Sequence, residues 1–466
     1  MADQFDRTAQ AALTSDSKAW PSPVLGWWAV FVLTLSYTAA YIDRQILGLL
    51  VEPIRNSMQI NDTQISLLGG AAFALFYVIM GLPLGRLADR VNRRNLIAGG
   101  IFVWSLMTAM CGLATNFWQL FMMRVGVGIG EATLSPAALS MISDYFPPKK
   151  RARPLGTYMV ALAIGSGLAF LVGGKVLQWM SGIPDLSLPI IGAIEPWQAA
   201  FIIVGLPGLL LVPMVLLIRE PARRGLRPQK TDTAKHQQTT LQIPLKEVAR
   251  FVFVENRNTF MVIFIAFGLL GLHSITLTMW LPPFFQRTFG WDTGEVGTRL
   301  GIIILIFASL GMIGGTSIAQ WMNQRGLKDA FLRAPLYLTL VMAPLAIALT
   351  LAPNAWISLG LCVPVIGLSF GLFAFVPGLL QSITPNQMRG QLGALFSLFN
   401  NVIGLIFGPT LVALITDFIF KDPMALKYSM TIVSAVTLPI AAIMLFLGLK
   451  HFSKSIDDAQ EWIDSM

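Results

Sequence analysis

Charged side chains are scarce in this chain. Asp, Glu, Lys and Arg make up 12% of its 466 residues, whereas hydrophobic residues make up 55%. A soluble domain carries about a quarter charged residues. The shortage excludes a soluble protein and predicts an all-α membrane protein that crosses the bilayer many times.

The sequence also lacks the residue patterns of disulfide frameworks, metal sites and nucleotide-binding sites. The two cysteines, Cys111 and Cys362, both lie inside apolar runs, which argues against a disulfide framework or a metal site. Two of the three histidines, His236 and His451, lie outside the apolar runs, and no phosphate-binding GxxxxGK[ST] loop occurs. We therefore expect no enzyme, no ATP-driven pump, no cofactor and no metal. A receptor or scaffold that does not transport is an alternative that the sequence does not exclude.

Apolar runs of about 20 residues are long enough to cross a bilayer as helices. The sequence contains twelve such runs, which predict twelve transmembrane helices in two six-helix halves. They cover residues 25–51, 64–87, 95–114, 117–145, 155–180, 197–218, 258–286, 294–322, 333–352, 355–383, 391–418 and 426–449.

Basic residues between these runs are distributed unevenly. The loops after every second span hold 21 Lys and Arg residues, whereas the loops between them hold five. Cytoplasmic loops carry such an excess, so we expect both termini in the cytoplasm and a multi-pass protein of a bacterial inner membrane. The net charge of +9 comes from these short clusters, which argues against a nucleic-acid partner.

One long hydrophilic stretch divides the chain. Within it, Leu245, Val248 and Val252 follow helical spacing and predict a short amphipathic helix on the membrane surface. The predicted organisation is an N-terminal tail (1–24), a six-helix half (25–219), a cytoplasmic linker (220–256), a second six-helix half (257–450) and a C-terminal tail (451–466).

Four charges stand well away from the ends of the spans of the first half. Arg124 and Glu131 lie seven residues apart in the run from Phe117 to Tyr145, so they share one helix face. Asp43 and Arg44 lie in the first span. Counting the helical rise places Asp43 level with Arg124, where they can pair, and Glu131 deeper, within reach of Arg44. Such charges are costly in a bilayer, so they indicate either a watery transport site or a structural ion network.

The facing spans of the second half are apolar, with three phenylalanines in the tenth, Phe370, Phe373 and Phe375. A cavity between the halves would therefore be amphipathic. An anionic or zwitterionic headgroup would meet Arg44 and Arg124, and the chain of an amphiphilic lipid would lie along the rings. A small organic anion would need polar contacts from both halves.

A carboxylate inside such a cavity can exchange a proton for an arginine partner as the cavity alternates between sides. Glu131 and Asp43 are the two candidates for this proton coupling. Glu131 is the better one, because it lies deeper and has no cation beside it in sequence, whereas Asp43 adjoins Arg44.

The run GRLADRVNRR, from Gly85 to Arg94, resembles the signature that the major facilitator superfamily carries between its second and third helices. Gly85, Asp89, Arg90 and Arg93 match that signature. The resemblance implies the major facilitator fold and a gating role for this loop.

In that superfamily the Asp of the signature meets the start of the eleventh helix, which would place Asp89 near residues 389–391 and hold the cytoplasmic gate shut. A carboxylate at a helix N-terminus is a favourable contact. Asp144 is a candidate partner for Arg90 or Arg93.

A closer resemblance covers nearly all of residues 40–225, in the strings YIDRQILGLLVEPIR, ISLLGGAAFALFYVIMGLPLGRLADR and RVGVGIGEATLSPAALSMISDYFPPKKRA. These resemble the bacterial members of the spinster-like branch, and NNVIGLIFGP (400–409) extends the likeness. Animal members of the branch move lysophospholipids and sphingosine-1-phosphate.

The spinster-like resemblance implies a secondary active transporter that works by alternating access, with spans one, four, seven and ten lining its cavity. We expect it to be a proton-coupled monomer that moves an amphiphilic lipid. The related anion–cation symporters carry similar charges in their first and fourth spans, so a proton-coupled symporter of small organic anions such as sugar acids stays the alternative.

Overall fold

The structure of the protein, a computed structural model, describes residues 20–183, 187–188, 192–223, 245–385 and 388–464. Within these residues, 12 helices are long and apolar enough to cross a membrane. The predicted all-α membrane fold of twelve spans in two halves is confirmed.

The first half contains six spans, three of them interrupted, and a short helix between the first two. Its elements are α2 (Pro23–Leu49), α3 (Val51–Met58), α4 (Asp62–Gly69) with α5 (Phe76–Arg90), α6 (Arg93–Cys111), α7 (Phe117–Glu131) with α8 (Leu134–Tyr145), α9 (Ala152–Met180), and α10 (Pro196–Leu209) with α11 (Leu211–Leu216). A π-helical turn, Ala71–Leu75, joins α4 to α5, and a 3-10 turn, Pro148–Lys150, precedes α9.

The second half repeats this plan. Its elements are α13 (Arg257–Phe289), α14 (Thr293–Ile303) with α15 (Ser309–Gln324), α16 (Ala330–Thr350), α17 (Ala355–Phe373) with α18 (Val376–Ile383), α19 (Arg389–Asn401) with α20 (Gly408–Leu414), and α21 (Leu426–Asp464). Further π-helical turns cover Phe251–Glu255, Ile304–Ala308, Val402–Phe407 and Ile415–Phe420, and a 3-10 turn covers Pro423–Ala425.

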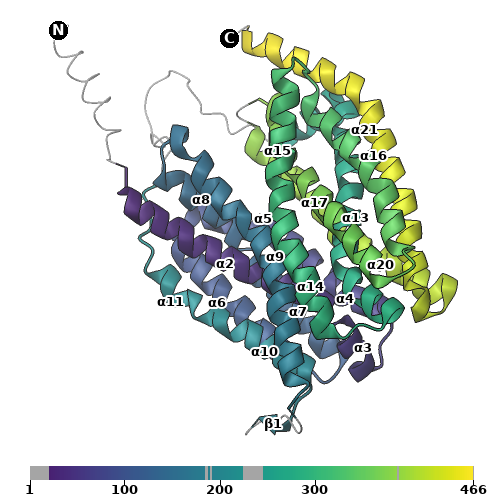
Figure 1. The fold of residues 1–466 in the computed structure, drawn as a ribbon. Coiled ribbons are helices and arrows are strands. Elements are labelled where there is room, and N and C mark those ends of the chain that lie inside the picture. The colour runs from purple at the N-terminus through teal and green to yellow at the C-terminus, as the bar shows by residue number, and fades with distance from the viewer. Residues whose placement is uncertain (1–19, 184–186, 189–191, 224–244, 386–387, 465–466) are drawn as a thin grey trace, which may run out of the picture.

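A short antiparallel hairpin, β1 (Ser187–Leu188) with β2 (Gly192–Ala193), follows the fifth span and was not expected from the sequence. It marks one end of the molecule, called here the hairpin end. The start of α2 and the end of α21 lie at the opposite end, called here the terminal end (Figure 1). The two halves meet toward the hairpin end and splay apart toward the terminal end (Figure 1).

The predicted linker is described only in part, because residues 224–244 lie outside the described residues. At its far end, α12 (Leu245–Arg250) leads into the π-helical turn Phe251–Glu255. Val248 and Val252 are both buried on one side of this segment. Their burial is what the helical spacing of the sequence predicts.

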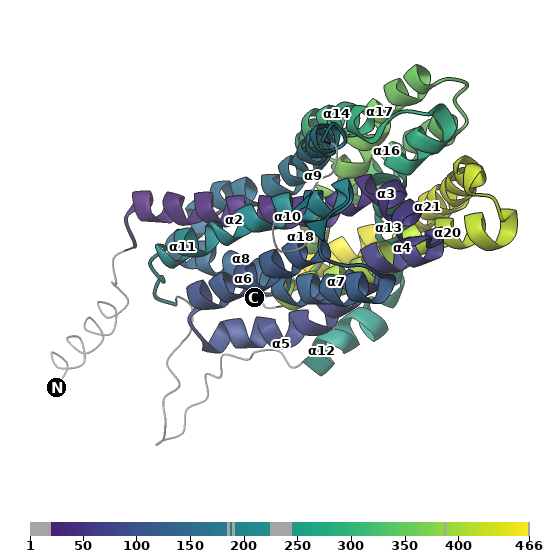
Figure 2. The ribbon, with the colours of Figure 1, turned by 90° about the horizontal axis from the view of Figure 1, so that it is seen from below.

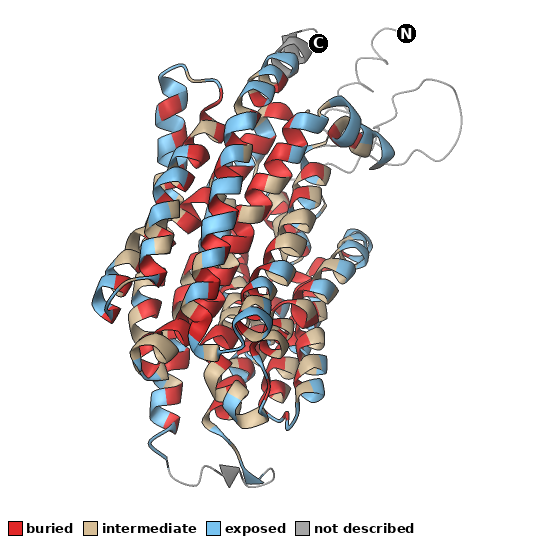
Figure 3. Ribbon diagram, turned by 90° about the vertical axis from the view of Figure 1, so that its right-hand side faces the viewer, coloured by how far each residue is buried: buried red, intermediate tan, exposed pale blue. Residues whose placement is uncertain are grey.

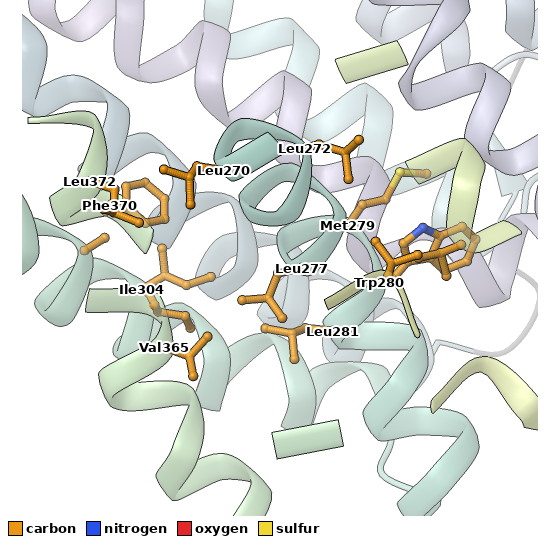
Figure 4. Packing of buried hydrophobic residues seen from close by; sticks show 14 of the residues in the cluster. Leu270, Leu272, Leu277, Met279, Trp280, Leu281, Ile304, Val365, Phe370 and Leu372 are labelled. Carbon is orange, nitrogen blue, oxygen red and sulfur yellow. The ribbon is translucent and has the colours of Figure 1, made fainter. Parts of the chain in front are cut away.

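Helix α13 lies at the centre of the second half. Its side chains Leu277 and Leu281 lie beside Ile304 and Val365 of the neighbouring spans, and Leu270 lies beside Phe370 (Figure 4). Buried residues follow the faces that the helices turn toward each other, and exposed residues cover the outer faces (Figure 3). Seen from below, α3 and α4 of the first half lie close to α13 and α20 of the second (Figure 2).

Two spans from opposite halves, α9 and α14, touch through their backbones. A Cβ added at Gly297 would lie 2.7 Å from the Cα of Gly174, and one added at Gly167 would lie 2.7 Å from the backbone of Leu305. Glycine is required at these positions because no side chain fits between the two helices. At Gly174 and Gly297 the contact joins the halves backbone to backbone, while Leu171 packs against Gly301 one turn further along.

The fourth span is interrupted directly after Glu131, at Ala132 and Thr133. Pro136 explains the break, because proline has no N–H to donate to the carbonyl of Ala132 and its ring crowds that carbonyl. The tenth span is interrupted in the same way between Phe373 and Val376, ahead of Pro377.

Candidate functional site

Arg44 and Glu131 form an ion pair in the interior of the first half. Nε of Arg44 lies 2.6 Å from Oε2 of Glu131, and the carboxylate is fully buried. The guanidinium lies within 4.6–5.1 Å of the centres of three rings, those of Tyr41, Phe73 and Tyr77. Cation–π contacts of this kind hold a cation in place when water is excluded. The pair therefore joins the first span to the point where the fourth span breaks.

Asp43 and Arg124 do not pair as the sequence predicted. Nη1 of Arg124 donates to the backbone carbonyl of Asp43 over 3.2 Å, while Oδ2 of Asp43 accepts a hydrogen bond of 3.1 Å from Thr108 on α6. Consecutive helical residues point about 100° apart, so Asp43 and Arg44 cannot both face the fourth span. The prediction of a carboxylate–guanidinium contact between Asp43 and Arg124 is wrong for this structure.

A cavity of about 200 Å³ lies between the two halves. Arg44 and Arg124 line it from the first half, and Phe370 and Phe373 line it from α17. A second cavity of about 510 Å³ adjoins it toward the terminal end and shares Arg44 and Phe373 as lining residues. Together they fall in the range of roughly 300–1,000 Å³ that is typical of small-molecule sites.

Phe375 does not reach this cavity. Its side chain is fully buried in a small cluster with Ala319, Met322, Ala330 and Ala334, on the far side of the tenth span. The backbone stays helical through Ala374 and Phe375, and side chains two residues apart in a helix point about 200° apart, so Phe373 and Phe375 face opposite directions. The expected substrate contact of Phe375 is wrong for this structure.

The cavity also contains polar groups that sequence reasoning undervalued. Ser274 and Thr278 of α13, and Asn400 and Asn401 of α19, line it from the second half. Oδ1 of Asn400 is buried and accepts no hydrogen bond within the described residues. Two adjacent asparagines in an apolar span are the signal that could have identified them.

The gating signature is held within the first half. Arg93 is buried and contacts Asp144 at 2.5 Å and Glu220 at 2.8 Å. The sequence allowed Asp144 to pair with Arg90 or Arg93, and in the structure Asp144 pairs with Arg93. Gly85 is half-buried, and a Cβ added there would meet no atom within 4 Å.

Asp89 does not meet the start of the eleventh span. Asp89 and Arg90 are exposed, and in the described part of the chain Asp89 makes no hydrogen bond or ion pair. Arg389 instead donates to the carbonyls of Gln381 and Thr384 in its own half. The halves are apart at the terminal end, so the contact that the resemblance implies between Asp89 and the eleventh span is not formed in this conformation.

At the hairpin end the halves are joined by buried charges. Arg287 of α13 lies 2.6 Å from both Glu52 and Asp62 of the first half, and its side chain is only 4% exposed. Nearby, the backbone and hydroxyl of Thr63 both donate to Asp417 over 2.7 Å. The cavity is therefore closed at the hairpin end and open at the terminal end.

Comparison with known proteins places the chain in a family. The family model of the Major Facilitator Superfamily matches residues 33–409. The chain belongs to this superfamily of membrane transporters.

Two relatives match nearly the whole chain. An MFS-type efflux pump of Mycolicibacterium smegmatis is 28% identical over 457 residues, covering 96% of this chain and 98% of the relative. A probable L-galactonate transporter of Escherichia coli is 27% identical over 434 residues, covering 90% of this chain and 88% of the relative.

A solved structure supports the spinster-like branch. It is that of a bacterial homologue to the human lysosomal transporter spinster, in an inward-facing and unoccupied conformation. Its TM-score is 0.75 and its identity 26%, over 93% of this chain and 99% of the solved chain. The resemblance to the spinster-like branch is confirmed, and that structure's inward-facing state agrees with a cavity open at one end.

Proposed function

We propose that this protein is a proton-coupled secondary transporter that moves an amphiphile with an anionic or zwitterionic headgroup by alternating access. One observation carries the proposal. A single cavity has Arg44, paired from behind with the buried Glu131, on one wall and the rings of Phe370 and Phe373 on the other. A ligand that fits both walls has a charged end and an apolar end.

The headgroup would bind at Arg44. Its side chain is 14% exposed, so the guanidinium keeps donors free beyond the one that Glu131 accepts. Arg124 is 1% exposed and already donates to backbone carbonyls, so it supports the site from behind. A phosphate at Arg44 would compete with the Glu131 carboxylate, and protonation of Glu131 would release the arginine to the substrate.

The apolar part would lie along α13 and α17. Ile275, Met279, Phe370 and Phe373 line the inner cavity, and Val376 and Leu380 continue the apolar wall toward the terminal end. Each CH₂ buried there contributes about 0.8 kcal/mol relative to water, and less for a lipid that arrives from the bilayer. The wall therefore favours longer chains.

Uptake into proteoliposomes tests the substrate class. Phe373→Ala should lower the apparent affinity for a long-chain lysophospholipid roughly tenfold, because losing a ring from the wall removes about 1.4 kcal/mol or more of contact. A short-chain analogue should lose less. Phe375→Ala is the matched control, since it removes the same ring outside the cavity and should leave chain-length dependence unchanged. Equal losses for both chain lengths in the Phe373 variant would reject the lipid proposal.

A symporter of small organic anions is the second candidate. The polar lining from Ser274, Thr278, Asn400 and Asn401 favours it, and one relative is a probable L-galactonate transporter. Asn400→Leu should then reduce sugar-acid uptake at least tenfold, because a polar solute left without its hydrogen bond loses about 1–3 kcal/mol. Robust uptake of a sugar acid by the wild type, with no response to lysophospholipids, would establish this alternative.

We further propose that the terminal end faces the cytoplasm of a bacterial cell, on the strength of the 21 to five distribution of basic residues. Cysteines placed at Ser187 and Thr233, in a background without Cys111 and Cys362, test this orientation. An impermeant maleimide should label the first from outside intact cells and the second only after lysis. Labelling at position 233 in intact cells would reverse the orientation.

A further inference from the structure

A groove of about 780 Å³ lies at the terminal end of the first half, apart from the transport cavity. It runs between the start of α2 and the loop that joins α8 to α9. Its lining combines aromatic and basic side chains, and none of the described residues that line it is acidic. The ones that matter here are Trp20, Trp27, Phe146, Lys149, Lys150 and Arg153.

The wall of the groove is built rigidly. The ring of Phe146 packs under the start of α2, where a Cβ added at Gly26 would lie 2.8 Å from it, and it meets Trp27 edge to face at 5.7 Å. Nε of Arg151 donates to the carbonyl of Phe146 over 2.8 Å. The 3-10 turn Pro148–Lys150 then fixes the backbone of the two lysines.

The three cations of the groove have no acidic partner among the described residues. Lys149, Lys150 and Arg153 are all exposed, and in the described part of the chain none of them forms an ion pair. Arg151, by contrast, is occupied by the loop it stabilises. Three like charges side by side, with no carboxylate among the described lining residues, attract an anion.

The groove also opens toward lipid. On the same turns of α2, Val24 is 77% exposed and Phe31 is 55% exposed, as expected of a surface that faces acyl chains. Trp27 is 44% exposed, and tryptophan is enriched at the level of lipid headgroups. The anion that fits is therefore one attached to an apolar chain.

We propose that this groove binds an anionic phospholipid from the leaflet at the terminal end. Its phosphate is held by Lys149, Lys150 and Arg153, and its acyl chains lie against Trp27 and α2. Basic pockets at helix ends are suited to such headgroups, and each cation near an anionic surface strengthens binding by about fivefold. The site is separate from the transport cavity and does not depend on the transported substrate.

Tryptophan fluorescence in nanodiscs tests the proposal. Brominated phosphatidylglycerol, which is anionic, should quench tryptophan fluorescence more strongly than brominated phosphatidylcholine, and this excess should shrink in Trp27→Phe, where Trp20 stays as a second tryptophan of the groove. The triple variant Lys149→Gln, Lys150→Gln, Arg153→Gln should weaken the preference for phosphatidylglycerol by roughly a hundredfold. The matched control removes three exposed cations at the same end of the second half, Lys246→Gln, Arg250→Gln and Lys328→Gln, and should keep the preference.

Three results would overturn the proposal. Equal quenching by the two lipids would mean that the groove does not select an anionic headgroup. Equal loss of the preference in both triple variants would assign it to general surface charge. Loss of the excess quenching on adding inorganic phosphate would assign the groove to a soluble anion. Native mass spectrometry should independently count retained phosphatidylglycerol in the wild type and not in the groove variant.

Discussion

The hairpin end and the terminal end of this transporter hold the same two halves in opposite ways. At the hairpin end, Arg287 bridges to Glu52 and Asp62 across the interface, and Thr63 binds Asp417. At the terminal end, Asp89 is exposed and Arg389 binds its own half. The stability of this conformation therefore resides at the hairpin end. Opening the hairpin end must break those contacts.

Arg287→Ala should have the largest effect on the closure of the hairpin end, because it removes the cation that lies 2.6 Å from both Glu52 and Asp62. Arg55 stays nearby, 3.9 Å from Glu52 and 3.5 Å from Asp62, and compensates only in part. Removing one partner of a buried ion pair costs about 3–5 kcal/mol, so the expected loss lies toward the lower end of that range. We expect a lower melting temperature in detergent and more molecules open at the hairpin end, seen as increased labelling of a cysteine at position 66, where Ser66 is buried and faces Thr410 across the interface. Lys328→Ala breaks an exposed pair with Asp457 and should change neither measurement. An unchanged melting temperature in the Arg287 variant would contradict the assignment.

Glu131→Gln should have the second largest effect, and this effect should be on transport. The substitution removes the charge that holds Arg44 midway between the two ends, and a hydrogen bond to a charged group is worth about 1.5–3 kcal/mol. The variant should still exchange substrate across the membrane but no longer concentrate it in response to a pH gradient. Glu247→Gln, on the exposed side of α12, is the control. If the Glu131 variant still accumulates substrate under an imposed gradient, proton coupling moves to Asp43 or is absent.

Thr63→Val should have a smaller effect of the same kind as Arg287→Ala. It removes one hydroxyl that donates to Asp417 and leaves the backbone donor in place, so the expected loss is about 1 kcal/mol. The melting temperature and the labelling from the hairpin end should both shift in the same direction as in Arg287→Ala. A shift in the opposite direction would show that this contact does not hold the halves together.

Asp89→Asn should have the smallest effect on stability, because the side chain is exposed in this conformation and makes no contact to lose. The melting temperature should stay unchanged while the transport rate falls, because the resemblance to the superfamily signature implies that Asp89 contacts the eleventh span only when the terminal end is closed. Asp458→Asn, also exposed at the terminal end, should leave both unchanged. A large drop in melting temperature for Asp89→Asn would mean that the gate is already engaged.

Much of the fold followed from the sequence, because span length and the scarcity of charge depend only on local composition. The charges inside the first half were also visible, since such residues are rare in a bilayer. Their pairing was predicted only partly. The Arg44–Glu131 contact followed from depth, whereas the carboxylate of Asp43 turned to Thr108, because helix rotation is set by packing that the sequence does not display.

Most of the features that the sequence did not predict are long-range. Arg287 and Glu52 are separated by 235 positions, so no local pattern connects them. Phe375 was misplaced for a local reason: it lies two residues after Phe373, so it points away from the helix face that Phe370 and Phe373 share. To predict that Asn400 lines the cavity, one must know which side of the eleventh span faces it.

The glycine contact between α9 and α14 has a consequence for the balance between conformations. Gly174 and Gly297 bring two backbones together with no side chain between them, so the halves can roll past each other there without rotamer changes. A methyl group at Gly297 would lie 2.7 Å from the Cα of Gly174, so the two backbones would have to move apart. Alanine at this position would therefore loosen the contact between the halves in this conformation and shift the equilibrium away from it.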